Sequence, residues 1–277
     1  SMRLWGPRNN GVGGGTSNIA KVVIRVDTDA GLYGLGEVDD FMGVRQAIAY
    51  MRDYFVGRDA FAANAIVSEM LYGTQAPNPA DAPKGVMPGG MISIRMCSPT
   101  ATPWGPVVWA ASGVDIALCD LIGKALKTPA YNLLGGRFRP SAKVYLDRSS
   151  PDDVTDLGAW RAMARETVAS GFTQMKFDID FMAPECVRDV WNRSLSLSQI
   201  NRIVERLTAV RESAGPDFEI CVDCHMQYNV PDVVRLLERI EPLNLLWLED
   251  PVPITNPDSC AQVRAKTSVP ICIGEMF

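Results

Sequence analysis

Short apolar runs alternate regularly with amphipathic segments along the second half of the chain. The runs are AKVYL (142–146), TQMKF (173–177), FEICV (218–222), LLWLE (245–249) and PICIGE (270–275). The segments between them, such as SLSQINRIVERLTAVRES, have the apolar spacing of helices. Strands that are apolar on both faces and alternate with helices predict a parallel sheet covered by helices. The pattern fits both an open doubly wound sheet and a closed (β/α)₈ barrel.

Three of these strands end in an acid, and the acids are equally spaced. Asp223, Glu249 and Glu275 follow one another at intervals of 26 residues, from 223 to 249 and from 249 to 275. One strand–helix unit takes up roughly this length when about 200–250 residues form eight units. We therefore expect the acids at the carboxyl ends of consecutive strands, the edge at which barrels carry their active sites. Alternatively, each acid caps the following helix or pairs with a Lys or Arg side chain.

Three carboxylates that converge on one point repel one another strongly unless a cation lies among them. Oxygen ligands favour a hard ion, and Mg²⁺ is the ion that best fits a site built from carboxylates. The spacing of the acids thus predicts an Mg²⁺ site formed by Asp223, Glu249 and Glu275.

The first half of the chain lacks this regular alternation of apolar runs and amphipathic segments. Residues 19–37 predict a β-hairpin, with KVVIRV and LYGLGE as its strands and TDAG as its turn. Residues 43–72 are mostly helical by pattern, and residues 73–107 are rich in Pro, Gly, Met and Ser without a clean period. Helical spacing returns in residues 109–136, which end in Gly135-Gly136. The predicted apolar face of this helix contains Val114, Ala117, Leu118, Leu121 and Ile122.

Six segments spread over nearly the whole chain resemble the enolase superfamily, in particular its mandelate racemase-like branch. They are VDTDAGLYGLGE, GVDIALCDLIGKALKTPAYNLLGG, QMKFD, VDCH, LLWLEDPVP and VPICIGE. The resemblance implies an α/β fold: an enolase-type α+β capping domain over residues 1–139, without its first strand, and a (β/α)₇β TIM-like barrel over residues 140–277. About the first five barrel strands would be present. The family's three Mg²⁺ ligands would be Asp223, Glu249 and Glu275.

The resemblance also implies a chemistry, in which a proton is removed from the carbon next to a carboxylate and Mg²⁺ stabilises the resulting enediolate. Such a proton is very weakly acidic, so the developing dianion needs a fixed cation. The chain ends two residues after Glu275, and the family's His–Asp base would lie beyond residue 277. We therefore expect either a truncated part of a longer enzyme, catalytically incomplete as it stands, or a non-catalytic remnant.

His225 is the only histidine of the chain and stands two residues after Asp223, in ICVDCHMQYNV. In an extended strand, His225 would lie on the same face as Asp223, whereas Cys224 would point away from the face of Cys221. This alternation disfavours a redox or zinc CxxC site, which needs both sulfurs together. Asp-x-His at this strand resembles acid-sugar dehydratases such as galactonate and mannonate dehydratase, in which the histidine protonates the departing 3-hydroxyl group. The alternative is a structural strand histidine.

Lys176 and Asp178 share a strand face in QMKFD, and both are candidate catalytic residues. Racemases of the mandelate racemase-like branch carry Lys-x-Lys at this strand, and their second lysine acts as a base. Asp178 at that position makes a racemase or cycloisomerase the less favoured alternative. Lys176 would contact the substrate carboxylate or the enediolate, unless it forms a salt bridge with Asp178. Trp247 is expected to fill the barrel interior.

Composition and charge limit which binding partners and which cellular compartment we expect for this protein. A net charge of −5 argues against nucleic acid or an anionic membrane surface as the main partner. No apolar run approaches the length needed to span a bilayer, and no signal-peptide pattern is present. The seven cysteines do not have the spacing of a disulfide framework, which is typical of reduced thiols in a cytoplasm. We expect a cytoplasmic, Mg²⁺-dependent lyase that removes water from an aldonic or aldaric acid and forms a homo-oligomer.

Overall fold

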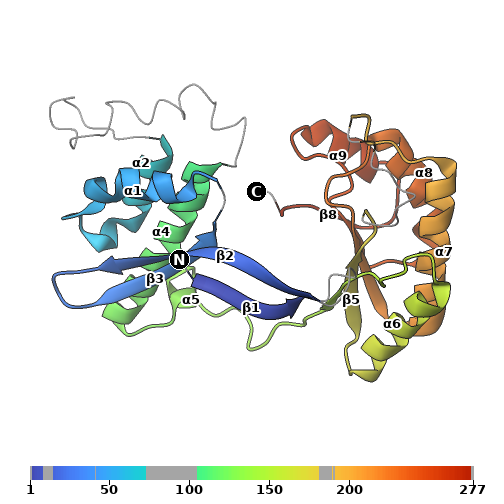
Figure 1. Cartoon of the computed structure of the whole chain (residues 1–277), viewed down its shortest axis with the longest axis horizontal. Helices are drawn as coiled ribbons and strands as arrows, with labels where there is room; N and C mark the ends of the chain where they lie inside the picture. Colours follow the sequence, from blue (N-terminus) through green and yellow to red (C-terminus); the bar gives the residue numbers. More distant parts are fainter. Residues whose placement is uncertain are drawn as a thin grey trace. The chain divides into compact units, whose positions relative to one another are not determined.

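The computed structural model describes residues 2–8, 15–40, 42–72, 105–180, 189 and 191–275 of the 277-residue chain. By internal packing the chain divides into two compact units, one mainly of residues 17–141 and the other mainly of residues 142–277 (Figure 1). The first unit holds the hairpin and the helices of the first half of the sequence. The second unit holds the alternating strands and helices.

Most of a three-stranded sheet belongs to the first unit. Its strands are β1 (Met2–Arg8), β2 (Gly15–Asp27) and β3 (Tyr33–Asp39), in the order β1-β2-β3. β2 and β3 are antiparallel, and the turn between them is closed by a hydrogen bond from the Thr28 amide to the Leu32 carbonyl. Gly31 in this turn has a φ of 75°, a left-handed conformation that glycine adopts without strain. The hairpin predicted over residues 19–37 is confirmed.

The strand β1 lies ahead of the hairpin in the sequence. It hydrogen-bonds to β2 and lies at the edge of the sheet. Its sequence, MRLWGPR, carries no clear strand signal because Gly6 and Pro7 interrupt the apolar pattern. Proline has no amide hydrogen and is tolerated in a sheet mainly on an edge strand, which is the place of β1.

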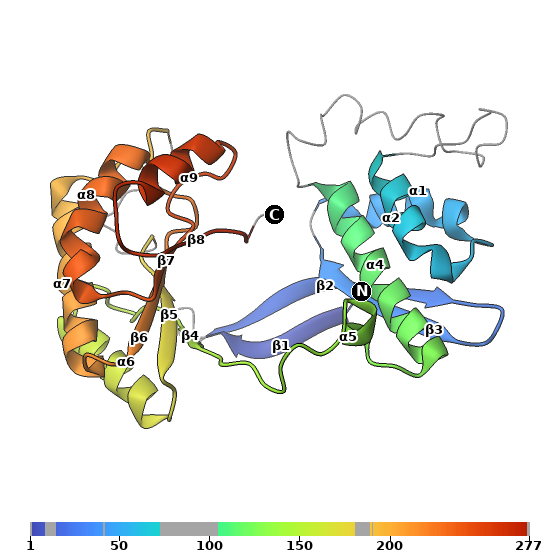
Figure 2. The ribbon, with the colours of Figure 1, turned by 180° about the vertical axis from the view of Figure 1, so that it is seen from behind.

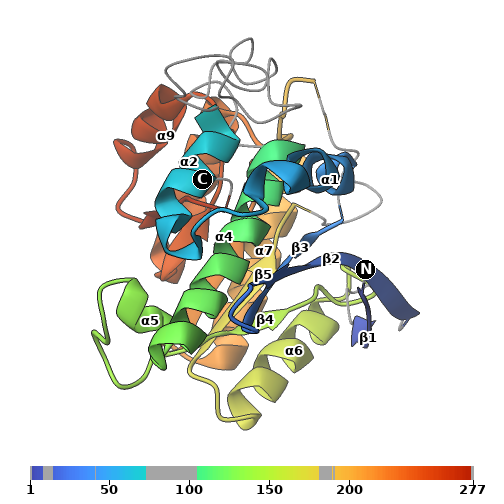
Figure 3. The ribbon, with the colours of Figure 1, turned by 90° about the vertical axis from the view of Figure 1, so that its left-hand side faces the viewer.

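The helical segments of this unit follow the sheet in the sequence. They are α1 (Val44–Phe55), the 3₁₀ turn η1 (Ala60–Ala62), α2 (Ala63–Tyr72), α4 (Pro106–Leu126) and α5 (Ala130–Leu133). Both α1 and α2 pack against α4 (Figure 3). The segment predicted to be irregular, residues 73–107, lies almost entirely outside the described residues. Gly135 and Gly136, with φ values of 106° and 93°, follow α5 and end the helical region as predicted.

Helix α4 approaches β3 at a distance that only glycine allows. A Cβ atom on Gly34 would come within 2.0 Å of the Ala117 carbonyl oxygen, and one on Gly36 within 2.0 Å of the Gly113 carbonyl oxygen. These two glycines alternate along the buried face of the strand, which explains the spacing in LYGLGE. The predicted apolar face of α4 is buried in the core of this unit at Val114, Ala117, Leu118 and Leu121, and partly buried at Ile122.

Among the described residues, one helix, α4, is long and apolar enough to cross a membrane by length and composition. This corrects the expectation that no apolar run reaches that length. The packing explains the apolar character of α4, because β3, α1 and α2 all contact it. The helix also carries Asp120, whose carboxylate accepts hydrogen bonds from the Leu35 amide and from Lys124. In this structure α4 is the central helix of its unit.

The second unit contains a parallel sheet of five strands paired in chain order. They are β4 (Leu146–Arg148), β5 (Gln174–Asp178), β6 (Glu219–Asp223), β7 (Trp247–Glu249) and β8 (Ile271–Cys272). The connections contain α6 (Leu157–Ala169), α7 (Leu197–Ala214), α8 (Val230–Ile240), the 3₁₀ turn η3 (Glu241–Leu243) and α9 (Pro257–Arg264). These helices lie on one face of the sheet (Figure 2). A doubly wound sheet has helices on both faces, so the described strands form part of a barrel, and the predicted fold class is confirmed.

The register of the strands separates the two faces of this sheet. Phe177, Val222 and Leu248 are register neighbours and are fully buried in the core that the helices cover. Side chains alternate along a strand, so the residues on either side of these three point to the opposite face. That face carries one row of Lys176, Cys221 and Trp247, and a second row of Asp178, Asp223 and Glu249 at the strand ends.

Candidate active site

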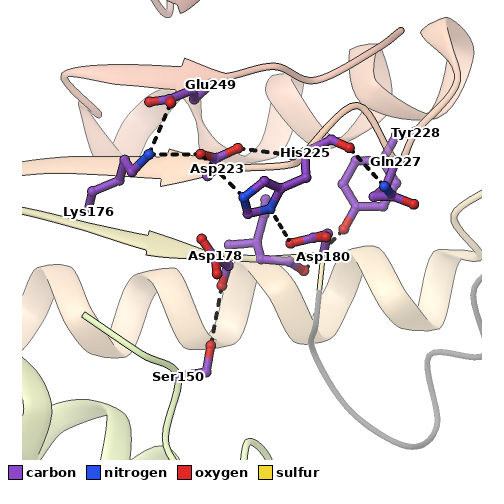
Figure 4. Close-up of polar contacts among 10 residues, drawn as sticks. Ser150, Lys176, Asp178, Asp180, Asp223, His225, Gln227, Tyr228 and Glu249 are labelled. Carbon is purple, nitrogen blue, oxygen red and sulfur yellow. Dashed lines mark hydrogen bonds and ion pairs between the residues drawn. The ribbon is translucent and has the colours of Figure 1, made fainter. Parts of the chain in front are cut away.

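The last residues of β5, β6 and β7 are Asp178, Asp223 and Glu249. Asp178 stands opposite Asp223 in the register, and Asp223 stands opposite Glu249. The strand ends thus bring three carboxyl groups to one edge of the sheet (Figure 4). Such a group of acids requires a compensating positive charge.

Lys176 supplies positive charge to this edge. Its Nζ atom lies 2.9 Å from Asp223 Oδ2 and 3.0 Å from Glu249 Oε1, and the three side chains are 13%, 1% and 15% exposed. Burial by itself lowers the pKa of Lys176, but its hydrogen bonds to the two carboxylates outweigh this effect and raise the pKa well above its ordinary value. Lys176 is therefore a fixed cation. A salt bridge with Asp178 is one of the two alternatives that the sequence leaves open for Lys176; the ion pairs of Lys176 are instead with Asp223 and Glu249.

The two carboxylates bound by Lys176 are also held by other donors. Burial raises the pKa of Asp223, but the Lys176 hydrogen bond and the backbone amide of His225, 2.9 Å from Asp223 Oδ1, lower it below its ordinary value. Asp223 is thus held as a carboxylate anion. Trp247 donates from Nε1 to Glu249 Oε2 at 2.8 Å, so this side chain orients a carboxylate in addition to occupying the inner face of the sheet.

His225 does not continue the strand. β6 ends at Asp223, and His225 and Met226 have φ values of 42° and 58°, in the left-handed region. The Met226 amide donates to the Asp250 carbonyl, and the Gln227 side chain donates to the His225 carbonyl. This turn directs the imidazole back toward the strand ends, with Nε2 3.8 Å from Asp223 Oδ2. The turn, and not the alternation of an extended strand, brings His225 close to Asp223.

A second carboxylate holds the other nitrogen of the imidazole. Asp180 Oδ1 lies 3.1 Å from His225 Nδ1, and the Asp180 side chain is fully buried. The hydrogen bond to Asp180 raises the pKa of His225 to about 9, although burial of the ring lowers it. The raised pKa favours the protonated imidazole, the form that can donate a proton. No pattern in the sequence indicates Asp180 as a site residue.

Asp178 lies in the same group of acids. Burial raises the pKa of Asp178 to about 6, while the charge of His225 opposes this rise. Ligand atoms of Asp178, Asp223 and His225 all lie within 4.8 Å of one another, so these residues form a candidate metal-binding group within the described part of the chain. This group differs from the set predicted from the sequence. Asp223 is common to both sets, whereas Glu249 and Glu275 belong only to the set predicted from the sequence.

Glu275 follows β8 by three residues, and its side chain is exposed. Burial raises the pKa of the neighbouring acid Asp250, and the charges of Asp223, Glu249 and Glu275 add to this rise. The charge of Glu275 therefore acts on Asp250, the residue that follows Glu249 at the end of β7. The bridge made by Lys176 joins the other two predicted ligands, Asp223 and Glu249.

The donor set fits a hard divalent cation. Two carboxylates on neighbouring strands converge on one ammonium nitrogen at 2.9 and 3.0 Å, so their negative charges already share one positive charge. All donors in the predicted set are carboxylate oxygens, the ligands that Mg²⁺ prefers. Asp223 and Glu249 thus have the charge and the ligand type for Mg²⁺, and Glu275 carries a further carboxylate three residues beyond β8.

The two cysteines of CVDC do not form a redox or metal pair. Cys221 and Cys224 are both buried free thiols. Burial raises the pKa of Cys221 to about 12 and raises the pKa of Cys224 well above its ordinary value. Cys224 packs in the hydrophobic core, while Cys221 lies on the face of Lys176 and Trp247. Burial thus disfavours the thiolate, the reactive form of cysteine, in both residues.

Both halves of the chain match known domain families. Residues 12–135 match the family described as mandelate racemase / muconate lactonizing enzyme, N-terminal domain, and residues 159–277 match the family described as enolase C-terminal domain-like. The chain belongs to the enolase superfamily. Within that superfamily it falls in the mandelate racemase / muconate lactonizing enzyme branch, and the resemblance seen in the sequence is confirmed.

The chain is related to acid-sugar dehydratases of this superfamily. D-xylonate dehydratase of Haloferax volcanii is 30% identical over 258 residues, 93% of this chain and 57% of that protein. D-galactarolactone cycloisomerase of Agrobacterium fabrum is 33% identical over 172 residues, 61% of this chain and 40% of that protein. A mandelate racemase/muconate lactonizing enzyme-like protein from Rubrobacter xylanophilus has a solved structure with a TM-score of 0.74 and 29% identity, over 94% of this chain and 66% of that one. The chain spans about three fifths of the length of the dehydratases that it matches.

Proposed function

We propose that this protein is an Mg²⁺-dependent dehydratase of acid sugars, a hydro-lyase that acts on an aldonic or aldaric acid. The observation that carries the proposal is the position of His225. Its imidazole is held by Asp180, whose hydrogen bond raises the pKa of His225 to about 9, and Nε2 faces the buried carboxylate of Asp223. A proton donor next to a carboxylate cluster has the arrangement that loss of a hydroxyl group requires.

The roles of the residues follow from this arrangement. Asp223, Glu249 and Glu275 would hold Mg²⁺, which supplies positive charge to the enediolate that forms once the α-proton is removed. His225 would donate the proton on Nε2 to the hydroxyl group on the β-carbon. The carbon–oxygen bond then breaks, water leaves, and the resulting enol rearranges to a 2-keto-3-deoxy acid. Lys176 would exchange its two carboxylate partners for the carboxylate of the substrate.

A racemase or cycloisomerase of the same branch is the second candidate. The similarity to D-galactarolactone cycloisomerase favours it, but that similarity extends over 61% of this chain, against 93% for D-xylonate dehydratase. Asp178 also stands where racemases of the branch have a lysine base. Exchange of the α-proton without loss of water would identify this second activity. Absence of both reactions in the whole protein would identify a non-catalytic relative.

The test replaces His225 by Asn in the whole protein and follows an acid-sugar substrate by NMR in D₂O. We expect dehydration to fall by about 10²–10⁴-fold, the usual contribution of a positioned acid. Exchange of the α-proton for deuterium should persist, because that half-reaction precedes loss of the hydroxyl group. The control is Met226→Leu, since the contact of that residue with Asp250 uses its backbone amide. If His225→Asn leaves dehydration unchanged, the proposed role of His225 is wrong.

A further inference from the structure

Asp180 has a fixed position beside the imidazole. Its side chain is fully buried, and its Oδ1 atom lies 3.1 Å from His225 Nδ1 (Figure 4). The preceding residue, Ile179, is anchored twice: its amide donates to the Asp223 carbonyl, and its carbonyl accepts from the Tyr228 hydroxyl at 3.1 Å. The backbone next to Asp180 is therefore tied both to the end of β6 and to the segment that follows His225.

The two nitrogens of the His225 ring face different groups. Nδ1 faces the Asp180 carboxylate at 3.1 Å, and Nε2 faces Asp223 Oδ2 at 3.8 Å. A buried carboxylate can only accept a hydrogen bond, so Nδ1 keeps its hydrogen whether the ring is charged or neutral. Transfer of a proton to a substrate is then left to Nε2, the nitrogen directed toward the strand ends.

We propose that Asp180 is a positioning residue for this reaction: it retains the hydrogen on His225 Nδ1 and so makes Nε2 the proton donor. The inference rests on the proposed function of His225 as the acid. The hydrogen on Nε2 leaves with the departing hydroxyl group as water, and the ring becomes neutral with its remaining hydrogen on Nδ1. Asp180 accepts the hydrogen bond from Nδ1 before and after this step, as the aspartate does in a Ser-His-Asp triad.

The variant Asp180→Asn distinguishes a positioning role of Asp180 from a role in packing alone. Asparagine has nearly the shape of aspartate, so Asp180→Asn preserves the packing. Its amide group, however, can donate a hydrogen bond to Nδ1, which moves the hydrogen of the neutral ring to Nε2. In Ser-His-Asp triads the same replacement leaves the geometry intact and lowers kcat by about 10⁴-fold through the wrong tautomer. A structural role predicts no such change in the ring.

The experiment compares Asp180→Asn with Asp232→Asn in the whole protein labelled with ¹⁵N-histidine. Asp232 is a matched control, because its buried carboxylate accepts hydrogen bonds from the Leu195 amide and from Arg235. His225 is the only histidine of these 277 residues, and the variant His225→Asn identifies its signals. Long-range ¹H–¹⁵N NMR shows which ring nitrogen carries the slowly exchanging hydrogen. Dehydration kinetics and Mg²⁺ titration are measured on the same samples.

We expect the parent and Asp232→Asn to keep the hydrogen on Nδ1, and Asp180→Asn to lose it from that nitrogen. The kcat of Asp180→Asn should fall by about 10²–10⁴-fold, with KM and Mg²⁺ binding within about threefold of the parent. Asp180→Glu, which retains a carboxylate, should keep the hydrogen on Nδ1 and recover part of kcat. If Asp180→Asn does not fold, Asp180→Glu tests the role of Asp180 in its place.

Two results would overturn the role of Asp180. One is a hydrogen that stays on Nδ1 in Asp180→Asn, and the other is an equal loss of kcat in Asp232→Asn. A failure of the proposed function has a different signature. In that case the parent has its hydrogen on Nδ1 but dehydrates no acid sugar, so the contact between Asp180 and His225 stands while the assignment of His225 as the acid falls.

Discussion

The bridge made by Lys176 predicts that this lysine competes with the metal. Its ammonium lies 2.9 Å from Asp223 Oδ2 and 3.0 Å from Glu249 Oε1, two of the three predicted ligands. Lys176→Met removes the charge and keeps an unbranched side chain of similar length. The variant therefore tests the charge with little change in packing.

Two effects of known size follow from this replacement. At an effective dielectric constant of about 20, opposite charges about 3 Å apart attract by about 5 kcal/mol, and removal of one partner of a buried pair costs about 3–5 kcal/mol. Lys176 and Glu249 keep some exposure, 13% and 15%, so we expect the lower figure. The metal-free variant should lose about 3 kcal/mol of its free energy of unfolding. This loss is a large part of the 5–15 kcal/mol typical of a folded protein.

The second effect concerns the metal. An ammonium group on the two carboxylates repels a divalent cation and occupies the same oxygens. Lys176→Met should therefore lower the Kd for Mg²⁺ by at least about tenfold, or about 1.4 kcal/mol. Mg²⁺ should also raise the stability of the variant by more than it raises that of the parent.

Urea unfolding without metal and isothermal titration with Mg²⁺ measure these two effects. The control is Lys143→Met, because Lys143 pairs with Glu219 at an exposed position and should change stability by no more than about 1 kcal/mol. If Lys176→Met matches the parent in both metal-free stability and Mg²⁺ affinity, the ammonium does not bridge the two ligands, and the reasoning is wrong.

Two other predictions concern the ligands and the packing of the first unit. Glu249→Gln should weaken Mg²⁺ binding by at least about tenfold in calorimetry, whereas His225→Asn should change it by less than about threefold; the reverse result would assign the metal to the group that contains Asp178 and His225. Gly36→Ala would place a Cβ atom 2.0 Å from the Gly113 carbonyl oxygen, so we expect a loss of more than about 2 kcal/mol in urea unfolding. A variant as stable as the parent would contradict the close packing of α4 on β3.

The regular part of the fold could be predicted from the sequence because local patterns determine it. The 26-residue interval between Asp223 and Glu249 predicts that they end neighbouring strands. The strand register places the two residues opposite each other. Strand limits were predicted less well. The run AKVYL suggests a strand at 142–146, but β4 begins at Leu146, where its pairing with Met175 of β5 begins. The limits of a strand depend on which residues of the neighbouring strand it pairs with, and the sequence of one apolar run does not contain that neighbour.

The contacts within the site could not be predicted in the same way. Lys176 and Asp178 share a face, but alternate residues of a strand are about 7 Å apart, and the neighbouring strand offers Lys176 a closer acid. Asp180 and His225 lie beyond the ends of β5 and β6, where strand alternation no longer sets the direction of a side chain. The positive φ of His225 is a property of the turn, and no residue type in ICVDCHMQYNV indicates it.

The most direct test of the proposed function is a product assay on the whole protein. Aldonic and aldaric acids are incubated with the protein and Mg²⁺, and the products are identified by NMR and mass spectrometry. The proposal predicts that at least one acid sugar loses water to give a 2-keto-3-deoxy acid, and that removal of Mg²⁺ with a chelator abolishes the reaction. Epimerisation or lactone isomerisation without loss of water, or no turnover of any acid sugar with Mg²⁺ bound, would contradict it.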